Sequence, residues 1–547
     1  MSRLLLLALL APALVWAQPR ITGIQNNYSY LVPGTPNYAI AQGSIFVLYG
    51  SNMAPAGVTQ QGFNPSLALT LAGVSIKVTS GGVTKDAIPY YVSPQQLAAI
   101  LPSSTPAGAA TLTVTYNGAT SAPFAFTIVR GAFGILTMGG NGLGNAAAQD
   151  ASYNFITPTN AANPGQAVIF WGTGQGPDPN DETRLIASPQ NLASLPFEFY
   201  IANKPARVLY HGRSTFPGLD QIVVEVPEGV SGCYASAYAK TGDYMSNFVS
   251  LPVAGDGRVC QDWFSSTGDV QRLLGSGKTE VNLGWFYLAK FKMYVPGLGG
   301  QQAMTVTQDS ATAQFMRSTP FDASNWGSVG GFANPGCVVT TWKTQDPFKA
   351  PFLKQLDAGT PVTLTLPDGT TRTLTRQNIA SHAFSVTDTT PGAQMIIPEL
   401  GGGTFRFRIP GGADVGAAEA SIAATPPLVW NEFLNINTVS RNAPLTVTWR
   451  GGTPGGLVII QGGALAGAAG EVYTSFGCTA PVEAGTFTVP RDVLASMVAS
   501  MTLPPFNAPT GTLLVQHFTY PARFTAPGLD HGSIVSLSYS ATQVHYR

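Results

Sequence analysis

A twelve-residue pattern that occurs twice constrains the fold of this chain more than any other feature. It reads AQGSIFVLYGSN at residues 41–52 and NPGQAVIFWGTG at residues 163–174. In each copy a glycine precedes a short apolar run that ends in an aromatic residue and a second glycine, and the glycines of the second copy lie 122 positions after those of the first. Glycine marks points at which a strand turns or closely approaches another backbone. We therefore expect two similar modules, each with this segment as an early core strand of a β-sandwich.

Further short segments follow each copy in the same order, which supports an internal repeat. They are residues 74–78, 87–92 and 96–101 after the first copy, and residues 197–201, 206–210 and 221–226 after the second. The last segment of each set stops at a proline, which cannot donate to a sheet ladder. Because Pro89 lies inside one segment, we expect that strand at a sheet edge. The spacing is typical of sandwiches, and it predicts one over residues 18–131 and a second over residues 132–254.

This order of elements resembles a known family. The segments LAGV (71–74) and YVSPQ (91–95), followed by a strand that ends at Pro102, are similar to the uncharacterised Solibacter-type domain of secreted acidobacterial proteins, and the segments AANPG (161–165) and WGTGQG (171–176) are similar to its second half. The first module more distantly resembles TIG-type immunoglobulin-like domains. The resemblance covers about residues 20 to 255 and implies an immunoglobulin-like fold, but the family brings no established activity. The chain departs from the family at residues 96–99, which read QLAA where an Ile-Asn-Phe-like strand is usual.

Beyond residue 255 the repeat fades, but β patterns continue. Residues 281–293 are mostly apolar at odd positions, which predicts a long strand with one buried face. Residues 362–375 predict a hairpin, since Asp368-Gly369 readily takes the positive φ of a tight turn. We expect a larger β-rich module over residues 255–426 and a fourth sandwich over residues 427–547. The predicted fold class is all-β, with tandem immunoglobulin-like β-sandwich modules.

The N-terminus predicts export. Residues 1–17 combine a basic Arg3, an apolar run from Leu4, and small residues before the expected cleavage site at Ala17. The alternative, a membrane anchor, needs about 20 apolar residues, and Pro12 and Gln18 cut the run short. We therefore expect a signal peptide and no stable membrane insertion after its cleavage. With 28 basic and 28 acidic residues, the chain also lacks the charge excess that nucleic acid or an anionic membrane requires.

Four cysteines in an exported chain can form disulfides. Cys233 and Cys260 flank a predicted module boundary, and we predict that they pair. Cys337 and Cys478 lie in different predicted modules, so a bridge between them requires a packed interface. Free buried thiols are the alternative for all four, and the pairing of the second two stays open. None of them is spaced as a metal site would require.

Motifs for chemistry are weak throughout. The segment LGSGKT (274–279) resembles a phosphate loop, but Arg272 stands where that pattern requires its first glycine. The histidines show no HExxH spacing, and no Gly-x-Ser-x-Gly elbow occurs. The loop Asp178 to Glu182 concentrates the oxygen ligands that calcium prefers, but it lacks the glycine and the spacing of an EF-hand. We therefore expect a solvated acidic loop, with a calcium site as the alternative. We predict no catalytic residues, no metal ligands and no cofactor.

Trp326 is the candidate ligand contact. It lies in the polar loop FDASNWG (321–327), where an indole ring could stack on a sugar, whereas Trp171 and Trp449 lie in apolar strands typical of a core. We therefore predict a secreted, non-catalytic, multidomain binding or structural protein of the extracellular space or cell surface. Its partner would be an extracellular protein or a glycan. The alternative is a carbohydrate-binding or glycan-active protein with its site in the third module.

Overall fold

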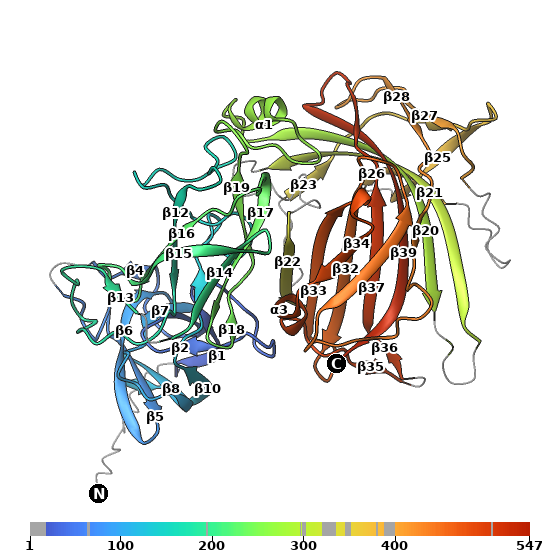
Figure 1. Cartoon of the computed structure of the whole chain (residues 1–547). Helices are drawn as coiled ribbons and strands as arrows, with labels where there is room; N and C mark the ends of the chain where they lie inside the picture. The colour runs from blue at the N-terminus through green and yellow to red at the C-terminus, as the bar shows by residue number, and fades with distance from the viewer. Residues whose placement is uncertain are drawn as a thin grey trace, which may run out of the picture.

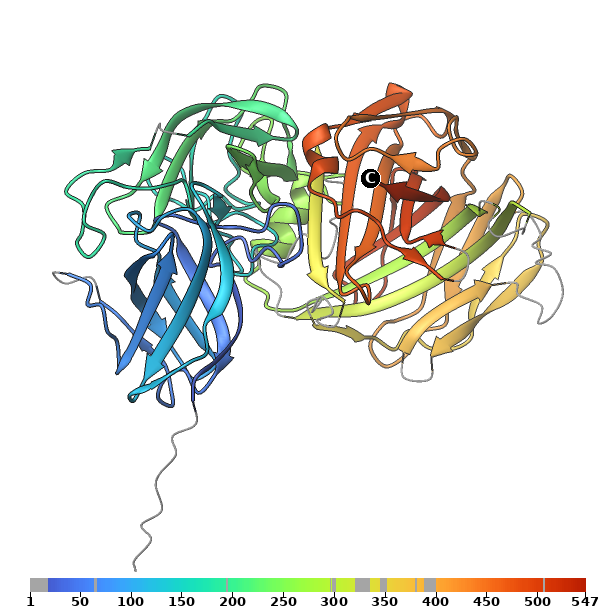
Figure 2. The same cartoon turned by 90° about the horizontal axis from the view of Figure 1, so that it is seen from below.

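The described part of the chain consists mainly of β-strands and the loops between them, with very little helix. The computed structural model describes residues 18–62, 66–192, 195–295, 297, 302–319, 335–344, 352–378, 381–387, 400–504 and 507–547. They form an all-β protein, as predicted, made of two sandwiches and a larger C-terminal body (Figure 1). Seen from below, the two sandwiches make one lobe and the C-terminal body makes the other (Figure 2). The predicted signal peptide and Trp326 lie outside the described residues.

The first sandwich has the strand order β1-β3-β7-β6-β5-β8-β10-β2. Strand β6 joins its two layers, because its first half pairs with β5 and its second half with β7. The first repeat copy forms β3, whose side chains Phe46 and Leu48 are buried between the layers. The strands are β1 (Arg20–Asn26), β2 (Ile40–Ala41), β3 (Ile45–Ser51), β4 (Thr59–Gln60), β5 (Val74–Ser80), β6 (Val83–Val92), β7 (Gln96–Ile100), β8 (Gly108–Tyr116), β9 (Ala119–Thr120) and β10 (Phe124–Val129).

The second sandwich repeats this order as β11-β12-β16-β15-β14-β17-β18. Here β15 joins the layers, since it pairs with β14 on one side and β16 on the other. The second repeat copy forms β12, in the place that β3 takes in the first sandwich. The strands are β11 (Gly134–Ile135), β12 (Ala167–Thr173), β13 (Gln190–Asn191), β14 (Phe197–Ile201), β15 (Lys204–Arg213), β16 (Asp220–Glu225), β17 (Gly232–Thr241), β18 (Tyr244–Met245) and β19 (Val249–Val253).

Pro89 lies in a central strand, so the expected edge position is wrong. Strand β6 has neighbours on both sides, and its register with β7 shifts between Pro89 and Tyr91. A bulge of this kind accommodates a residue that cannot donate to the ladder. The second sandwich keeps the same irregularity without a proline, between Val208 and Tyr210 of β15. The bulge therefore belongs to the repeated architecture, at the point where the strand crosses from one layer to the other.

The two repeat copies contact each other where the sandwiches meet. The Ile45 N–H of the first copy donates to Thr173 Oγ1 of the second at 2.8 Å. Each second glycine is required by a close approach: a Cβ on Gly50 would lie 2.0 Å from Arg20 O, and one on Gly172 would lie 2.2 Å from the Phe133 ring. The conspicuous pattern in the sequence thus supplies both a core strand and a contact between modules.

The C-terminal body contains a 15-stranded sheet whose main order is β22-β33-β32-β37-β39-β20-β21-β26-β25-β24-β27-β28. A three-stranded sheet, β29-β31-β34, and a two-stranded sheet, β35-β36, accompany it. The elements are α1 (Thr267–Leu274), β20 (Val281–Val295), β21 (Met304–Thr319), β22 (Cys337–Lys343), β23 (Phe352–Gln355), β24 (Val362–Thr365), β25 (Thr371–Asn378), β26 (Ser381–Thr387), β27 (Thr404–Ile409), β28 (Ala418–Ala423), β29 (Leu428–Trp430), β30 (Thr438–Val439), β31 (Leu445–Gly451), β32 (Leu457–Ala466), β33 (Val472–Pro481), a 3-10 turn (Val482–Ala484), β34 (Thr486–Val489), α3 (Arg491–Ala495), β35 (Thr502–Leu503), β36 (Ala508–Pro509), β37 (Gly511–Phe518), β38 (Ala522–Phe524) and β39 (His531–Tyr546).

This large sheet crosses the expected boundary at residue 427. Strand β20 pairs in parallel with β39, and β22 pairs with β33, so residues 255–426 and 427–547 do not form separate sheets. The first half of β20 is also buried on both faces rather than one: Phe286 packs into one core while Leu283 packs into another. When both faces of a strand are buried, apolar residues occur at odd and even positions alike. Alternation in the sequence therefore does not show that the second face is buried too.

The two lobes are joined by continuous apolar packing. One core cluster contains Phe248 of the second sandwich together with Val339 and Val493 of the C-terminal body. Tyr200 and Tyr238 stack at 5.0 Å beside it, and Lys240 forms an ion pair with Asp492 at 3.6 Å. This shared core fixes the orientation of the sandwiches relative to the large sheet.

Candidate functional site

The acidic loop of the second sandwich surrounds a buried arginine. Asp178 and Glu182 are 5% and 7% exposed, and the Arg213 side chain is fully buried. Arg213 Nε donates to Asp220 Oδ1 at 2.7 Å, Arg213 Nη2 donates to Gly176 O at 3.1 Å, and Arg213 Nη1 lies 3.9 Å from Glu182 Oε1. The expectation of a solvated loop is therefore wrong for two of its three acidic residues, because they compensate a charge more than thirty positions away in the sequence.

The same cluster ties the first sandwich to the second. Glu182 accepts hydrogen bonds from both the backbone N–H and the hydroxyl of Ser103, and Ser103 belongs to the first sandwich. Burial raises the pKa of Glu182, while the Ser103 hydrogen bonds and the Arg213 charge oppose that rise. In the described residues no three His, Cys, Asp or Glu side chains are grouped as a metal ion would need. The cluster holds the sandwiches together.

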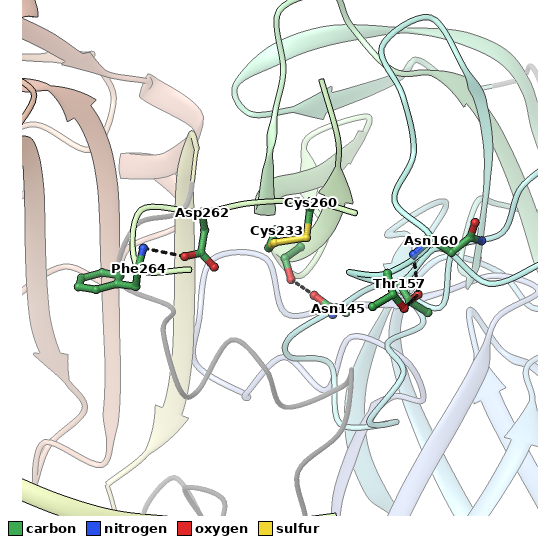
Figure 3. The surroundings of a disulfide bond; sticks show 9 residues. Asn145, Thr157, Asn160, Cys233, Cys260, Asp262 and Phe264 are labelled. Carbon is green, nitrogen blue, oxygen red and sulfur yellow. Dashed lines mark hydrogen bonds between the residues drawn. A yellow bond between two sulfur atoms is a disulfide. The ribbon is translucent and has the colours of Figure 1, made fainter. Parts of the chain in front are cut away.

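Cys233 and Cys260 form a disulfide, which is the pairing predicted from the sequence. This disulfide connects β17 to the segment leading to α1 (Figure 3). Beside it, Phe264 N–H donates to Asp262 at 2.7 Å, and the sulfurs pack in an apolar cluster with Val270 of α1. The disulfide therefore fastens the second sandwich to the start of the C-terminal body.

Cys337 and Cys478 also form a disulfide, which settles the pairing that the sequence left open. They stand directly opposite each other on the antiparallel strands β22 and β33, an arrangement that brings Cβ atoms within bridging distance. Two disulfides and no free cysteine indicate an oxidising compartment. No helix among the described residues is long and apolar enough to cross a membrane.

A groove in the C-terminal body is the candidate binding site. It has a volume of about 540 Å³ and lies between the β20–β21–β39 part of the sheet and the segment that carries β29. Register places six polar residues on one face of these strands as its floor, because Lys290 pairs with Asp309 and Ser538, and Lys292 pairs with Thr307 and Ser540. Phe291 and Tyr539 alternate to the other face, where their rings pack at 4.7 Å.

The wall of the groove is apolar and aromatic. It comprises Pro427, Leu428, Val429, Trp430 and Phe433. The Trp430 and Phe433 rings lie 5.7 Å apart at 56°. Leu428 N–H donates to Ser538 Oγ at 3.4 Å and so joins the wall to the floor.

Charge in the groove is predominantly positive. Lys292 Nζ stands 5.0 Å above the centre of the Phe433 ring. The described residues provide no ion-pair partner for Lys290. The carboxylate of Asp309 accepts a hydrogen bond from the Leu400 backbone N–H, so it is already engaged. The floor could have been found in the sequence, because Lys290 and Lys292 lie at alternate positions of a mostly apolar strand. No feature of the sequence identifies the wall that faces them.

A second cluster resembles a Ser–His–Asp arrangement. Ser533 Oγ lies 3.2 Å from His531 Nε2, and His531 Nδ1 lies 3.8 Å from Asp269 Oδ1. Burial and the Arg523 charge lower the pKa of His531 to about 4. Burial opposes ionisation of Asp269, but hydrogen bonds from Ser266 and Arg272 and the Arg523 charge lower its pKa to about 2. The residue types and their order in space match those of a hydrolase triad.

Arg523 occupies the position that a substrate would need in this cluster. Its Nη1 contacts His531 Nε2 and donates to Ser533 Oγ at 2.7 Å, and its Nη2 pairs with Asp269 at 3.0 Å. Ser533 is fully buried, so its hydroxyl cannot meet a carbonyl from solution. The network instead fastens α1 to β38 and β39.

The phosphate-loop resemblance also has a structural explanation. The segment GSGKT follows α1, whereas a phosphate loop precedes its helix. Lys278 forms an ion pair with Asp530 at 2.5 Å. This lysine therefore links the turn after α1 to the segment before β39.

The described residues form an all-β protein of two sandwiches and a larger C-terminal body, and that body carries a groove with a polar floor. No protein-family model matches the chain, and no curated protein matches it. Solved structures with partial similarity include the gamma-CGTase of an alkalophilic Bacillus clarkii, at 12% identity and a TM-score of 0.16 over 50% of this chain and 34% of that chain. They also include the Yersinia pseudotuberculosis adhesin InvE, at 15% identity and a TM-score of 0.13 over 41% of this chain and 60% of that chain. A tandem of titin immunoglobulin domains matches at 8% identity and a TM-score of 0.12 over 40% of this chain and 92% of that chain. The chain thus spans about a third of the first of these proteins, and likeness at this level establishes no relationship.

Proposed function

We propose that this chain is an exported, non-catalytic binding protein of the extracellular space or cell surface, and that its ligand occupies the groove between β20–β21–β39 and β29. The volume of about 540 Å³ supports this, since ligand sites typically measure about 300–1,000 Å³ and combine apolar walls with a few polar groups. The two disulfides support export. Kinship with the Solibacter-type secreted domain is part of the same proposal and agrees with such a role.

The composition of the groove supports binding rather than turnover. Glycoside hydrolysis uses a pair of carboxyl groups, whereas the described lining holds only Asp309, which already accepts a hydrogen bond from the Leu400 N–H. The same lining contains no histidine, the commonest general acid–base residue, and no cysteine. The Ser533 network is closed by Arg523.

A groove-filling variant tests the proposal. The mature chain from Gln18 is screened by thermal unfolding against soluble oligosaccharides and peptides, because a ligand that binds only the folded state raises the unfolding temperature. Thr307→Trp places a large ring in the groove from an exposed strand position and should abolish the shift. Thr111→Trp, on exposed β8 of the first sandwich, is the matched control and should retain it. Unchanged binding by Thr307→Trp, or measurable turnover of the ligand, contradicts the proposal.

A further inference from the structure

We infer that a second copy of this chain docks on the outer face of the large sheet, so that two chains form a symmetric dimer. The outer face consists of the side chains of β22, β33, β32, β37, β39, β20 and β21 that point away from β34 and α3. One row across it comprises Val338, Gly477, Gln461, Leu514, Ala541 and Met293. The inference goes beyond the proposed function, because the floor of the groove lies on the opposite face of these strands.

The outer face has room for a partner. The opposite face is covered, since residues of β34 and α3 pack with residues of β32 in one core. On the outer face, Gln461 and Thr512 are exposed, and a Cβ added to Gly477 would meet no atom within 4 Å. The segment before α1 covers one end of this face, where Phe264 packs with Leu457. Beyond that end, a partner can approach the sheet directly.

The outer face carries no charged side chain. Among the described residues of its seven strands, no Asp, Glu, Lys or Arg occurs at a position on this face. Its polar side chains also bond to one another. Gln516 Nε2 donates to Gln461 Oε1 at 3.0 Å, and the Thr340 and Ser475 hydroxyls lie 2.9 Å apart. Because these groups keep their hydrogen bonds when covered, burying them costs little.

The composition of the outer face is that of an interface. The Trp342 and Tyr473 rings lie 4.6 Å apart on it, and both are half-buried. The Phe291 and Tyr539 rings, also half-buried, lie 4.7 Å apart. The cores of protein interfaces are depleted in charged residues and enriched in aromatic residues and methionine. Large exposed patches that contain such side chains mark interaction sites.

Charge and size select a second copy as the partner. In a two-fold dimer the same surface meets itself, so a charged residue near the axis would lie close to its own copy, and the outer face has none. Strands lie about 4.8 Å apart and residues rise about 3.4 Å along them, so the seven strands over roughly six residues give a footprint of roughly 600 Å². Two copies would bury about 1,200 Å², which is the lower limit of the usual range for stable interfaces. Two twisted sheets also pack well face to face, about 10 Å apart.

Sedimentation analysis of the chain from Gln18 onward tests the inference. We expect a reversible dimer between about 1 and 100 μM, because an interface of this size gives modest affinity. Added sodium chloride should leave the dimer intact, since no charges lie in the interface. Gln461→Glu keeps the shape of an exposed side chain and adds a charge, and the cost of desolvating that charge should weaken dimerisation at least about tenfold. Gln60→Glu, at an exposed position of β4 in the first sandwich, is the matched control and should dimerise like the parent.

A second variant keeps the test independent of any single substitution. Thr512→Lys adds the opposite charge at another exposed position of the outer face and should weaken the dimer to a similar extent, because an uncharged partner face penalises either sign. Thr111→Lys, on exposed β8, is its control and should dimerise like the parent. Unfolding temperatures of the dilute variants check that each one folds.

Three results would overturn the inference. The first is a chain that stays monomeric over the whole concentration range, including one that instead binds a neutral polysaccharide such as insoluble cellulose. The second is a dimer that Gln461→Glu and Thr512→Lys both leave intact. The third is a dimer that dissociates when salt is raised, because its interface would then be a charged surface elsewhere on the molecule.

Discussion

Replacement of Arg213 by methionine should destabilise the second sandwich more than any surface substitution. Methionine retains an unbranched side chain but removes the guanidinium that faces Asp220 and Glu182. Asp220 would remain fully buried, with the Gln175 N–H as a hydrogen-bond donor at 2.7 Å. Glu182 would keep its hydrogen bonds from Ser103 but lose the opposite charge.

The expected loss follows from the uncompensated charge. Breaking a buried ion pair by removing one partner costs about 3–5 kcal/mol. Since about 1.4 kcal/mol corresponds to a factor of ten in an equilibrium constant, the population of the locally opened second sandwich should rise roughly 140- to 3,700-fold. The loss should shrink at lower pH. Without Arg213, burial would hold the carboxyl pKa values above their unfolded values, so the folded variant would bind protons more tightly and gain stability as the pH falls.

Native-state hydrogen exchange of the chain from Gln18 onward measures this change region by region. Peptides from β12 and β16 should exchange faster by that factor at pH 7, while peptides from β32 and β37 of the C-terminal body serve as an internal reference. Arg207→Met is the matched control, since Arg207 is an exposed arginine of the same strand β15, ion-paired with Glu225, and should stay within a few fold of the parent.

A double variant identifies the cause. Arg213→Met combined with Asp220→Asn removes both charges of the closest pair and should recover much of the lost protection, because the most deeply buried carboxylate is gone. An acceleration below about tenfold for Arg213→Met, or no recovery in the double variant, would refute the reasoning from buried charge.

Three further outcomes are expected. Replacing both Cys337 and Cys478 by alanine should lower the free energy of unfolding by about 5 kcal/mol, and replacing Cys233 and Cys260 should lower it by about 3.6 kcal/mol. The first loss is larger because that disulfide closes a loop of 141 residues and the second closes one of 27. Urea unfolding checks this, since the first variant should have the lower midpoint. Burial lowers the pKa of His517 to about 4, so between about pH 6.5 and pH 4 the unfolded state binds a proton that the folded state does not. The free energy of unfolding should therefore fall by about 3 kcal/mol between pH 7 and pH 4. The unfolding temperature should decline less over that range in His517→Gln than in the parent. Gly172→Ala should destabilise by about 1–3 kcal/mol through its clash with the Phe133 ring, whereas Gly255→Ala, which meets no atom within 4 Å, should be neutral in thermal unfolding.

Local signals in the sequence predicted local structure well. The repeat at residues 41–52 and 163–174 located β3 and β12, and the segments after each copy appear in matching places of the two sandwiches. The Asp368-Gly369 turn joins β24 and β25 as expected. These features depend on residues that are close together in the chain, so local composition and periodicity are enough to predict them.

Features that depend on distant residues could not be predicted. One of the two partners of β20 is β39, about 250 positions later in the chain. No local signal links these two strands, and a boundary at residue 427 was therefore predicted between them. The acidic residues Asp178 and Glu182 suggested a solvated loop until Arg213 was placed among them. The groove likewise joins Lys290 to a wall about 140 positions later in the chain, and the predicted contact Trp326 lies outside the described residues.

The position of β39 has a consequence for how the C-terminal body is made. This strand is synthesised after every other strand of the sheet, yet it lies between β37 and β20 in the middle of it. Until it arrives, both halves of the sheet present open edges, which readily pair with other chains. The body therefore exposes two unpaired sheet edges until its last strand is made, and we expect loss of residues 531–546 to leave a chain that aggregates rather than a shorter folded protein.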